Sequence, residues 1–144
     1  MTDQNWEEVK LPWVKWGLVG DNIEGTLIGV SEKESHLPGK EGEMQKIYEI
    51  KADKGSFHEI DSKKNPVAKA TTIEAGEIYS IGGKDGINSQ MKRIMIGQKV
   101  RLSFTEEKEP TTKGFNAFKL IKVMTNGQMD QEWLDGREIN AGDL

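Results

Sequence analysis

The feature that most constrains this chain is the order of predicted elements over residues 85–123. Apolar residues first recur at helical spacing and stop before Gly97, a residue type that favours the left-handed end of a helix. This helix is expected to be capped by Asp85 and to carry Ile87, Met91, Ile94 and Met95 on one face. A strand over 99–104, a polar loop over 106–114 and a last strand over 115–124 follow. One helix that leads into a closing hairpin is typical of the second half of a small Greek-key barrel.

Strand-like segments precede the helix and complete this pattern. They are predicted over 23–31, 44–52, 56–60 and 77–81, with a short edge segment over 67–72. Residues 53–55, Asp-Lys-Gly, are expected to form a tight turn that joins 44–52 to 56–60 as a hairpin. Recurrent hairpins with a single helix disfavour a parallel α/β sheet. The sequence therefore predicts an all-β domain with one helix, built as a five-stranded Greek-key barrel of the OB type with an acidic C-terminal tail.

Composition divides the chain into three parts. Residues 1–12 are predicted to form a polar arm, 13–127 the barrel, and 128–144 an acidic tail that is expected to be disordered. The last fifteen residues hold five acidic residues and one basic residue, so they carry the whole net charge of -4. Residues 84–122, in contrast, hold nine basic and four acidic residues. This asymmetry indicates a polyanionic ligand for the barrel and a protein partner for the tail.

Residue types that carry catalysis or metal binding are sparse in this sequence. There is no cysteine, which excludes disulfides, thiolate metal sites and a cysteine nucleophile. The two histidines, His36 and His58, belong to no spaced ligand or nucleophile pattern. The glycine-rich segment 82–86 lacks the spacing of a phosphate loop. We therefore expect no enzymatic activity, no catalytic residue, no cofactor and no metal site.

Segments that target a chain to a membrane are not evident either. No apolar run approaches the length of a membrane span, and the N-terminal residues do not have the pattern of a signal peptide. The absence of cysteine fits a reducing compartment. The sequence therefore predicts a cytoplasmic protein that does not bind membranes.

Barrels of the OB type bind oligonucleotides on one face, so single-stranded nucleic acid is the expected ligand. The candidates for base stacking are Trp16, Tyr48, Phe57 and Phe115, and the alternative for such aromatic residues is a place in the core. The candidates for phosphate binding are Lys46, Lys51, Lys84, Arg101, Lys113 and Lys119. The candidates for partner binding in the tail are Trp133, Leu134 and Asp135. The alternative for the tail is a packed extension with Trp133 in a surface pocket.

Three segments carry a likeness to a known family. They are NIEGTLIG at 22–29, GQKVRLSF at 97–104 and KGFNAFK at 113–119. With the acidic C-terminus, residues 13–144 resemble phage-type single-stranded DNA-binding proteins with an OB fold. The resemblance implies a protein that coats single-stranded DNA non-specifically during replication and recombination, in the host cytoplasm if viral. It also implies that the tail recruits replication or recombination proteins.

The end of the chain departs from this family. Such tails typically end in an aromatic residue, whereas this chain ends in Gly-Asp-Leu. The departure puts the recruiting role of the tail in doubt more than strand binding.

Other functions for the same barrel remain open from the sequence. Residues 1–129 carry no net charge, which favours a protein-interaction or structural module in a viral or replication assembly, without nucleic-acid binding. Single-stranded RNA is a third alternative, because only contacts to the 2′-hydroxyl distinguish it from DNA. The sequence does not set the oligomeric state.

Overall fold

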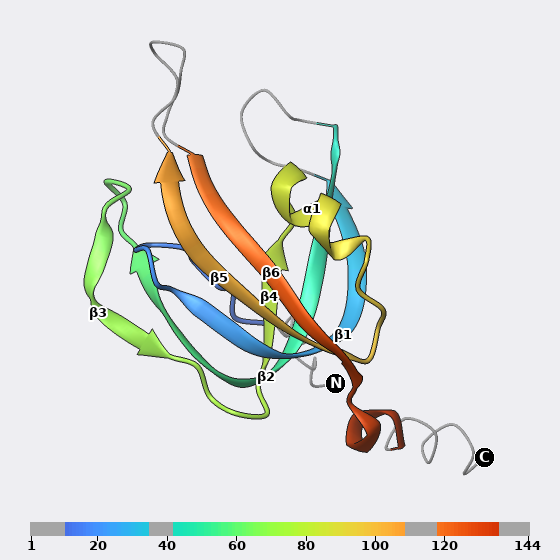
Figure 1. Cartoon of the computed structure of the whole chain (residues 1–144). Coiled ribbons are helices and arrows are strands. Elements are labelled where there is room, and N and C mark those ends of the chain that lie inside the picture. Colours follow the sequence, from blue (N-terminus) through green and yellow to red (C-terminus); the bar gives the residue numbers. More distant parts are fainter. Residues whose placement is uncertain (1–10, 35–41, 109–117, 136–144) are drawn as a thin grey trace, which may run out of the picture.

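The computed structural model describes residues 11–34, 42–108 and 118–135, and it is an all-β structure with few helices (Figure 1). Its strands are β1 (Asn22–Glu34), β2 (Met44–Ile60), β3 (Pro66–Thr72), β4 (Ile78–Gly82), β5 (Gln98–Lys108) and β6 (Phe118–Met129), and its helix is α1 (Asp85–Met91). All strand pairs are antiparallel and belong to one sheet with the order β3-β2-β1-β5-β6, in which β4 also pairs with β2. The short edge segment predicted at 67–72 is confirmed as β3, which lies at one edge of the sheet and brings the number of strands among the described residues to six.

The long strand β2 organises the sheet. Its 17 residues pair with β1 along one edge, while β4 and β3 share the other edge. β4 pairs with residues 47–51 of β2, and β3 pairs with residues 56–60. A single strand thus links the part of the sheet beside α1 to the β3 side (Figure 1).

The hairpin predicted at residues 53–55 is wrong, because β2 continues through them without a turn. Lys54 pairs with Glu24 and Ala52 with Gly25, which leaves Asp53 as the extra residue of a β-bulge. Gly55 has a φ of 148°, and a Cβ there would lie 2.3 Å from the Asn22 carbonyl oxygen. Asp53 and Gly55 are residue types that favour a turn, but here Asp53 forms a bulge and Gly55 lets two strands approach closely.

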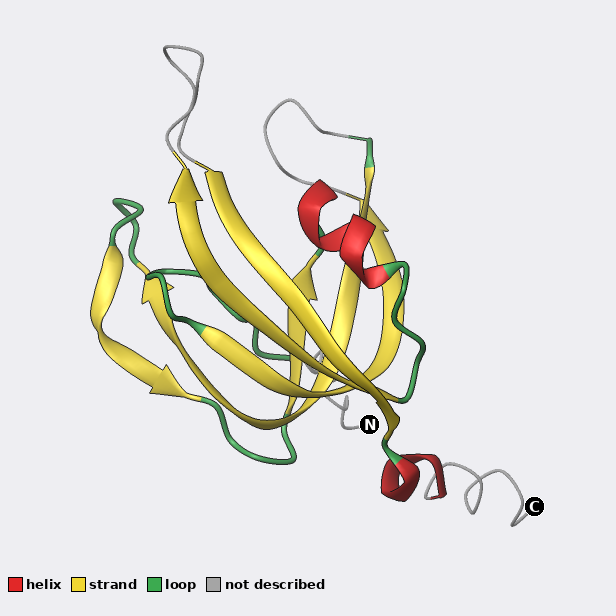
Figure 2. Ribbon diagram, in the orientation of Figure 1, coloured by secondary structure: helices red, strands yellow, loops and turns green. Residues whose placement is uncertain are grey.

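The strands form a strongly curved sheet (Figure 2). The buried hydrophobic residues form one cluster, to which strands β1, β2, β4, β5 and β6 and helix α1 contribute. The fully buried residues of this core include Ile23 and Leu27 of β1, Ile50 and Phe57 of β2, Ile81 of β4, and Leu102 and Phe104 of β5. The alternation of apolar and polar residues predicted for 100–105 is confirmed, since Val100, Leu102 and Phe104 are all at most 3% exposed.

Helix α1 joins the two sides of the sheet through side-chain hydrogen bonds. The Tyr48 hydroxyl of β2 donates to Asn88 Oδ1 at 2.7 Å. On the other side, Gln90 Nε2 donates to the Ile121 carbonyl at 2.7 Å, and the Val123 amide donates to Gln90 Oε1 at 2.8 Å. The Gln90 amide therefore satisfies backbone groups of β6, as a neighbouring strand would.

Helix α1 is shorter than the sequence pattern predicts. Ile87 and Met91 are buried, but the helix ends at Met91, and Met95 is 65% exposed rather than part of the apolar face. The expected cap is also different, because the N-cap position is Lys84, without a side-chain hydrogen bond. Gly97 has the expected left-handed φ of 100°, yet its amide binds the Leu27 carbonyl and so leads into β5.

Both ends of the described chain pack against the sheet. Near the N-terminus, the Val14 amide donates to the Ser80 carbonyl, and the Ser80 amide donates to the Pro12 carbonyl. At the C-terminus, β6 extends to Met129 and residues 131–135 form one helical turn. The predicted boundary at 127/128 therefore lies inside β6. The expected disorder is wrong for residues 128–135, whereas residues 136–144 and most of the arm over 1–12 lie outside the described residues.

Candidate nucleic-acid interface

The aromatic residues predicted to stack on bases lie in the core. Trp16 is 5% exposed, Tyr48 4% and Phe57 1%. Phe57 packs edge-on against Tyr79 with ring centroids 6.4 Å apart, and burial raises the pKa of the Tyr48 hydroxyl. A base needs an exposed ring face, so the stacking role predicted for these three residues is wrong for this conformation. Phe115 lies outside the described residues.

Three of the predicted phosphate-binding lysines lie on segments that are distant in sequence and converge around Gly83 and Lys84. The Gly83 amide donates to the Lys46 carbonyl at 2.7 Å, which ties the end of β4 to the start of β2. Lys84 follows Gly83 in the chain, and Lys119 of β6 is close enough to act on its charge. We call Lys46, Lys84 and Lys119 the lysine cluster.

The position of Gly83 leaves no room for a side chain. A Cβ at this residue would lie 2.4 Å from Asn88 Oδ1, 2.7 Å from the Lys46 carbonyl oxygen and 3.2 Å from Lys46 Cβ. Glycine therefore allows β2, β4 and α1 to converge. This convergence brings Lys46 and Lys84 to the same end of the sheet.

Lys46 stands opposite Glu32 and Lys119 opposite Glu107 across the sheet, but these pairs do not close into ion pairs. None of the three lysines makes an ion pair within the part of the chain that the structure describes. Desolvation, and then repulsion from the Lys119 ammonium, lower the pKa of Lys84. Lys119 Nζ donates to the Trp16 carbonyl and lies 5.6 Å from the centroid of the Phe104 ring. An anion between Lys84 and Lys119 would replace this repulsion with attraction.

The remaining predicted phosphate ligands are placed elsewhere. Arg101 lies on the outer face of the sheet and binds Glu24, with 2.8 Å between Arg101 Nε and Glu24 Oε1. Lys51 is exposed on β2, where it pairs across the sheet with Thr26. Lys113 lies outside the described residues. The structure thus assembles half of the predicted set and separates Arg101 and Lys51 from it.

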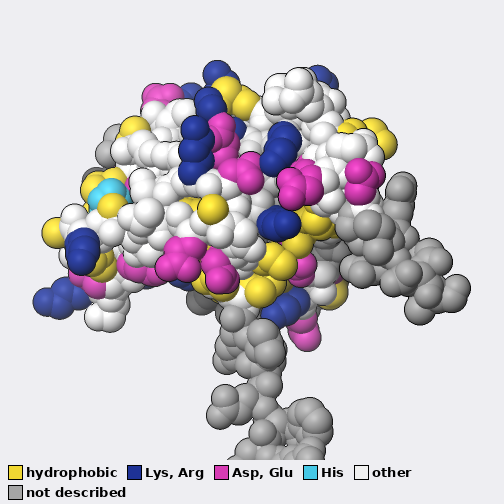
Figure 3. All heavy atoms as spheres, turned by 90° about the horizontal axis from the view of Figure 1, so that it is seen from below, with side chains coloured by type: hydrophobic (Ala, Val, Ile, Leu, Met, Phe, Trp, Pro, Cys, Tyr) yellow, Lys and Arg dark blue, Asp and Glu magenta, His cyan; other side chains and the backbone are white. Residues whose placement is uncertain are grey.

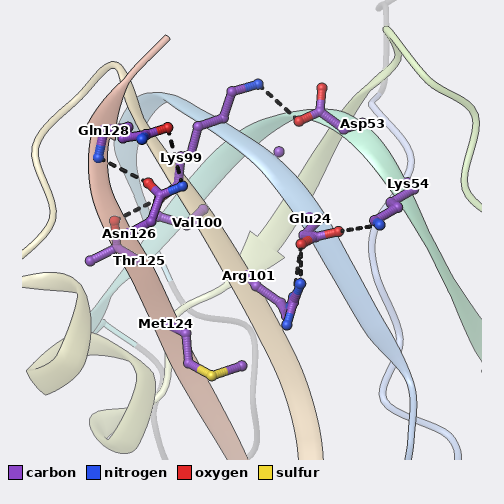
Figure 4. Close-up of a pocket in the computed structure, with 11 residues that line it drawn as sticks. Glu24, Asp53, Lys54, Lys99, Val100, Arg101, Met124, Thr125, Asn126 and Gln128 are labelled. Atoms are coloured by element: carbon purple, nitrogen blue, oxygen red, sulfur yellow. Dashed lines mark hydrogen bonds and ion pairs between the residues drawn. The ribbon is translucent and has the colours of Figure 1, made fainter.

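The outer face around Arg101 is a cleft of about 460 Å³ whose charges are paired with each other (Figure 4). Its charged lining consists of Glu24, Asp53, Lys54, Lys99 and Arg101, which we call the ion-pair face. Lys54 and Arg101 both reach Glu24, and Lys99 Nζ lies 2.9 Å from Asp53 Oδ2. Basic and acidic side chains are correspondingly interleaved on the surface of the molecule that Figure 3 shows.

The ion pairs of this face shift the pKa values of Glu24 and Lys99. The Arg101 hydrogen bond, assisted by Lys54, lowers the pKa of Glu24 against the opposing effect of desolvation. Desolvation alone would lower the pKa of Lys99, but the carboxylates of Asp53 and Asp130 raise it. A phosphate group would have to displace these carboxylates, so the ion-pair face is a poorer anion site than the lysine cluster.

Trp13 is an aromatic residue near the lysine cluster that is not among the four residues predicted to stack on bases. It is half-buried, forms a parallel bridge with Ser80 of β4, and its ring lies against Gly82. Gln45 Nε2 lies at the same glycine and donates to the Gly83 carbonyl at 3.4 Å. The pairing of Trp13 with β4 joins residues far apart in sequence, so local spacing does not reveal it.

The residues predicted for partner binding in the tail are partly used in packing. Trp133 and Leu134 are half-buried, and their side chains lie against Gly97. Asp135 is exposed and accepts a hydrogen bond from Gln131 Nε2 at 2.7 Å. This arrangement corresponds to the alternative of a packed extension for residues 128–135. Recruitment of a partner by this segment stays a prediction.

Comparison with known proteins adds no family to this geometry. No protein-family model matches the chain, and no curated protein or solved structure matches it significantly. Among the described residues, none of the helices has the length and apolar character to traverse a membrane.

Proposed function

We propose that this protein binds single-stranded DNA without sequence preference, through the lysine cluster and Trp13. The observation that carries the proposal is the convergence of Lys46, Lys84 and Lys119 with no ion-paired carboxylate among the described residues. Three cations from β2, the β4–α1 junction and β6 can follow a phosphodiester backbone. Each phosphate that replaces a counterion at such a site adds to affinity.

We infer that the sheet is a variant of the OB barrel. The order β1, β2, β4, α1, β5 and β6 agrees with five barrel strands that have one helix before the last two, and β3 is then an insertion. Helix α1 bridges β2 and β6 through Asn88 and Gln90, where an OB barrel would close. In this assignment the lysine cluster lies at one end of the barrel.

Trp13 supplies the aromatic part of the proposed site. Its ring is half-buried against Gly82, next to the glycine that Lys46 contacts. A base that stacks on such a ring contributes about 1–3 kcal/mol. Contacts to the phosphodiester backbone and to the faces of the bases do not depend on the base sequence. Such contacts suit a protein that coats exposed single strands during replication or recombination, for example in a bacteriophage.

A titration of fluorescent oligo-dT of about 30 nucleotides at several salt concentrations tests the proposal. The wild-type chain should bind the single strand in a salt-dependent manner and should not bind a duplex. For Lys84→Gln/Lys119→Gln, affinity should fall, and the slope of log K against log salt should decrease by about 1.4, as for two lost phosphate contacts on a single strand. Lys63→Gln/Lys69→Gln removes two exposed lysines of the β2–β3 hairpin and is the matched control. An equal loss in both variants would contradict a specific role for the lysine cluster.

A second candidate is a protein-interaction or structural module of the same fold. The ion-pair face favours it, because charges that neutralise each other in a cleft suit a protein partner better than a polyanion. Absence of oligonucleotide binding at low salt, for the full chain and for a chain that ends at residue 135, would favour this candidate.

A further inference from the structure

Three exposed apolar side chains gather where α1 leads into β5. Met95 is 65% exposed, Ile96 43% and Met129 38%, and they are three of the eight large hydrophobic residues exposed in the described part of the chain. Met129 pairs with Gln98, and its Cε atom would lie 2.8 Å from a Cβ at Gly97, so it reaches the segment that holds Met95 and Ile96. We call these three residues the methionine patch.

Opposite charges flank the methionine patch on its two sides. Lys92 and Arg93 precede Met95 at the end of α1, and all three are exposed. Glu132 and Asp135 follow Met129 on the C-terminal helical turn, and they are exposed as well. None of these four charged residues takes part in an ion pair within the described residues. The segment before the patch, with Lys92 and Arg93, is thus its basic side, and the helical turn after it, with Glu132 and Asp135, is its acidic side.

We propose that the methionine patch is the centre of a symmetric interface between two copies of this chain. A two-fold axis through the patch places the basic side of one copy against the acidic side of the other. The same operation stacks the three apolar residues of each copy on those of its partner. A surface whose charges are segregated in this way is complementary to itself, which singles out a second copy as the occupant. The inference does not depend on nucleic-acid binding.

The interface is small and places no charge at its centre. Burial of exposed methionine and isoleucine side chains favours association, and the charged rim sets the orientation. We therefore expect a dimer that dissociates in the micromolar range and forms faster at low salt.

Light scattering coupled to size-exclusion chromatography, over a micromolar concentration series of the full chain, tests this proposal. The apparent mass should rise from 16.2 kDa towards twice that value as concentration increases. Met95→Glu should abolish the rise, whereas Met44→Glu, at a methionine that is 59% exposed on β2, should not affect it. A wild-type chain that stays monomeric, or a dimer that survives Met95→Glu, would overturn the proposal. A monomer in which Met95 is nevertheless protected from oxidation would assign the patch to another occupant.

Charge reversal gives a test that a loss of folding cannot mimic. Arg93→Glu alone and Glu132→Arg alone should each weaken the dimer, because each places like charges opposite one another. The double variant Arg93→Glu/Glu132→Arg should restore association towards the wild-type level. Failure of the double variant to dimerise, with an unchanged melting temperature, would count against the two-fold arrangement.

Discussion

The Thr26 hydroxyl of β1 donates a hydrogen bond to Asp130 Oδ2 at 2.5 Å, across a sequence separation of 104 residues. Asp130 also caps the C-terminal helical turn, because its Oδ1 atom accepts a hydrogen bond from the Trp133 amide at 3.1 Å. Lys99 Nζ lies 3.5 Å from the same carboxylate. One acidic side chain therefore fixes the end of the described chain to the middle of the sheet.

The charge of Asp130 should make the packing of the C-terminal turn dependent on pH. Desolvation would raise the pKa of Asp130, but hydrogen bonds from Thr26 and Trp133 and the charge of Lys99 lower it. The ionised Asp130 carboxylate therefore stabilises the folded state fully above its pKa in the unfolded chain. This contribution is lost as the pH falls through the lower pKa of Asp130 in the folded chain. Asp130→Asn keeps a residue type that caps helices well but removes the charge. The wild-type chain should therefore have a larger free energy of unfolding than this variant near neutral pH. The difference between the two free energies should vanish in acid. Urea unfolding at a series of pH values measures this difference, and a pH-independent difference would contradict it.

Substitution of Gly83 should disrupt the convergence of β2, β4 and α1. Gly83→Ala places a methyl group within 2.7 Å of both Asn88 Oδ1 and the Lys46 carbonyl oxygen, which should destabilise the fold by about 1–3 kcal/mol. Gly86→Ala is the matched control, because a Cβ there meets no atom within 4 Å and alanine favours a helix. This control should be stabilising by up to about 1 kcal/mol. Thermal unfolding of the two variants should therefore shift in opposite directions, and a shift in the same direction would be incompatible with this packing.

Removal of the Gln90 amide should loosen β6 locally. Gln90→Ala leaves the Ile121 carbonyl and the Val123 amide without their partner, at a cost of about 1–3 kcal/mol. Hydrogen exchange of the Val123 amide should accelerate by more than that of β1 amides. Ser89→Ala, which removes an exposed hydroxyl next to Gln90, should leave this exchange unchanged. Uniform acceleration across the sheet would argue against a local bridge.

Substitution of Trp13 should affect DNA binding, whereas substitution of the buried Tyr48 should affect only stability. Trp13→Ala should weaken oligo-dT binding by about 1–3 kcal/mol, or roughly 5- to 150-fold. Tyr48→Phe keeps the buried ring and removes only the hydroxyl that binds Asn88, so it should lower stability without a change in affinity. Fluorescence anisotropy at fixed salt provides the comparison. An affinity loss for Tyr48→Phe but not for Trp13→Ala would reverse the assignment of the stacking residue.

The elements that could be predicted from the sequence are those whose pattern is local. The alternation of Val100, Leu102 and Phe104 specifies a strand with one buried face, and the spacing of Ile87 and Met91 specifies the buried face of α1. Tertiary contacts override the pattern elsewhere. Met95 continues the helical spacing, but its amide binds Gln98 Oε1 and the chain leaves the helix.

Long-range pairing also explains what the sequence did not reveal about the site. The residues at 53–55 have the composition of a turn, and only the register with β1 makes Asp53 a bulge. The lysine cluster depends on contacts between β2, the β4–α1 junction and β6, which the sequence does not show. The density of basic residues along the chain therefore selects Arg101 as well, although Arg101 binds Glu24. Burial of Trp16, Tyr48 and Phe57 follows from three-dimensional packing, which residue type alone does not specify.

The bulge at Asp53 has a mechanical consequence. On one side of it β2 is held by both β1 and β4, whereas near its C-terminal end β3 pairs with residues 56–60 and has all but one of its residues exposed. In Figure 1, β3 lies at the side of the molecule opposite to α1. Beyond the buried Phe57, the tip of the β2–β3 hairpin is thus an appendage on the sheet. Its length and sequence can change during evolution with little effect on the core, and so can its reach towards whatever the protein contacts.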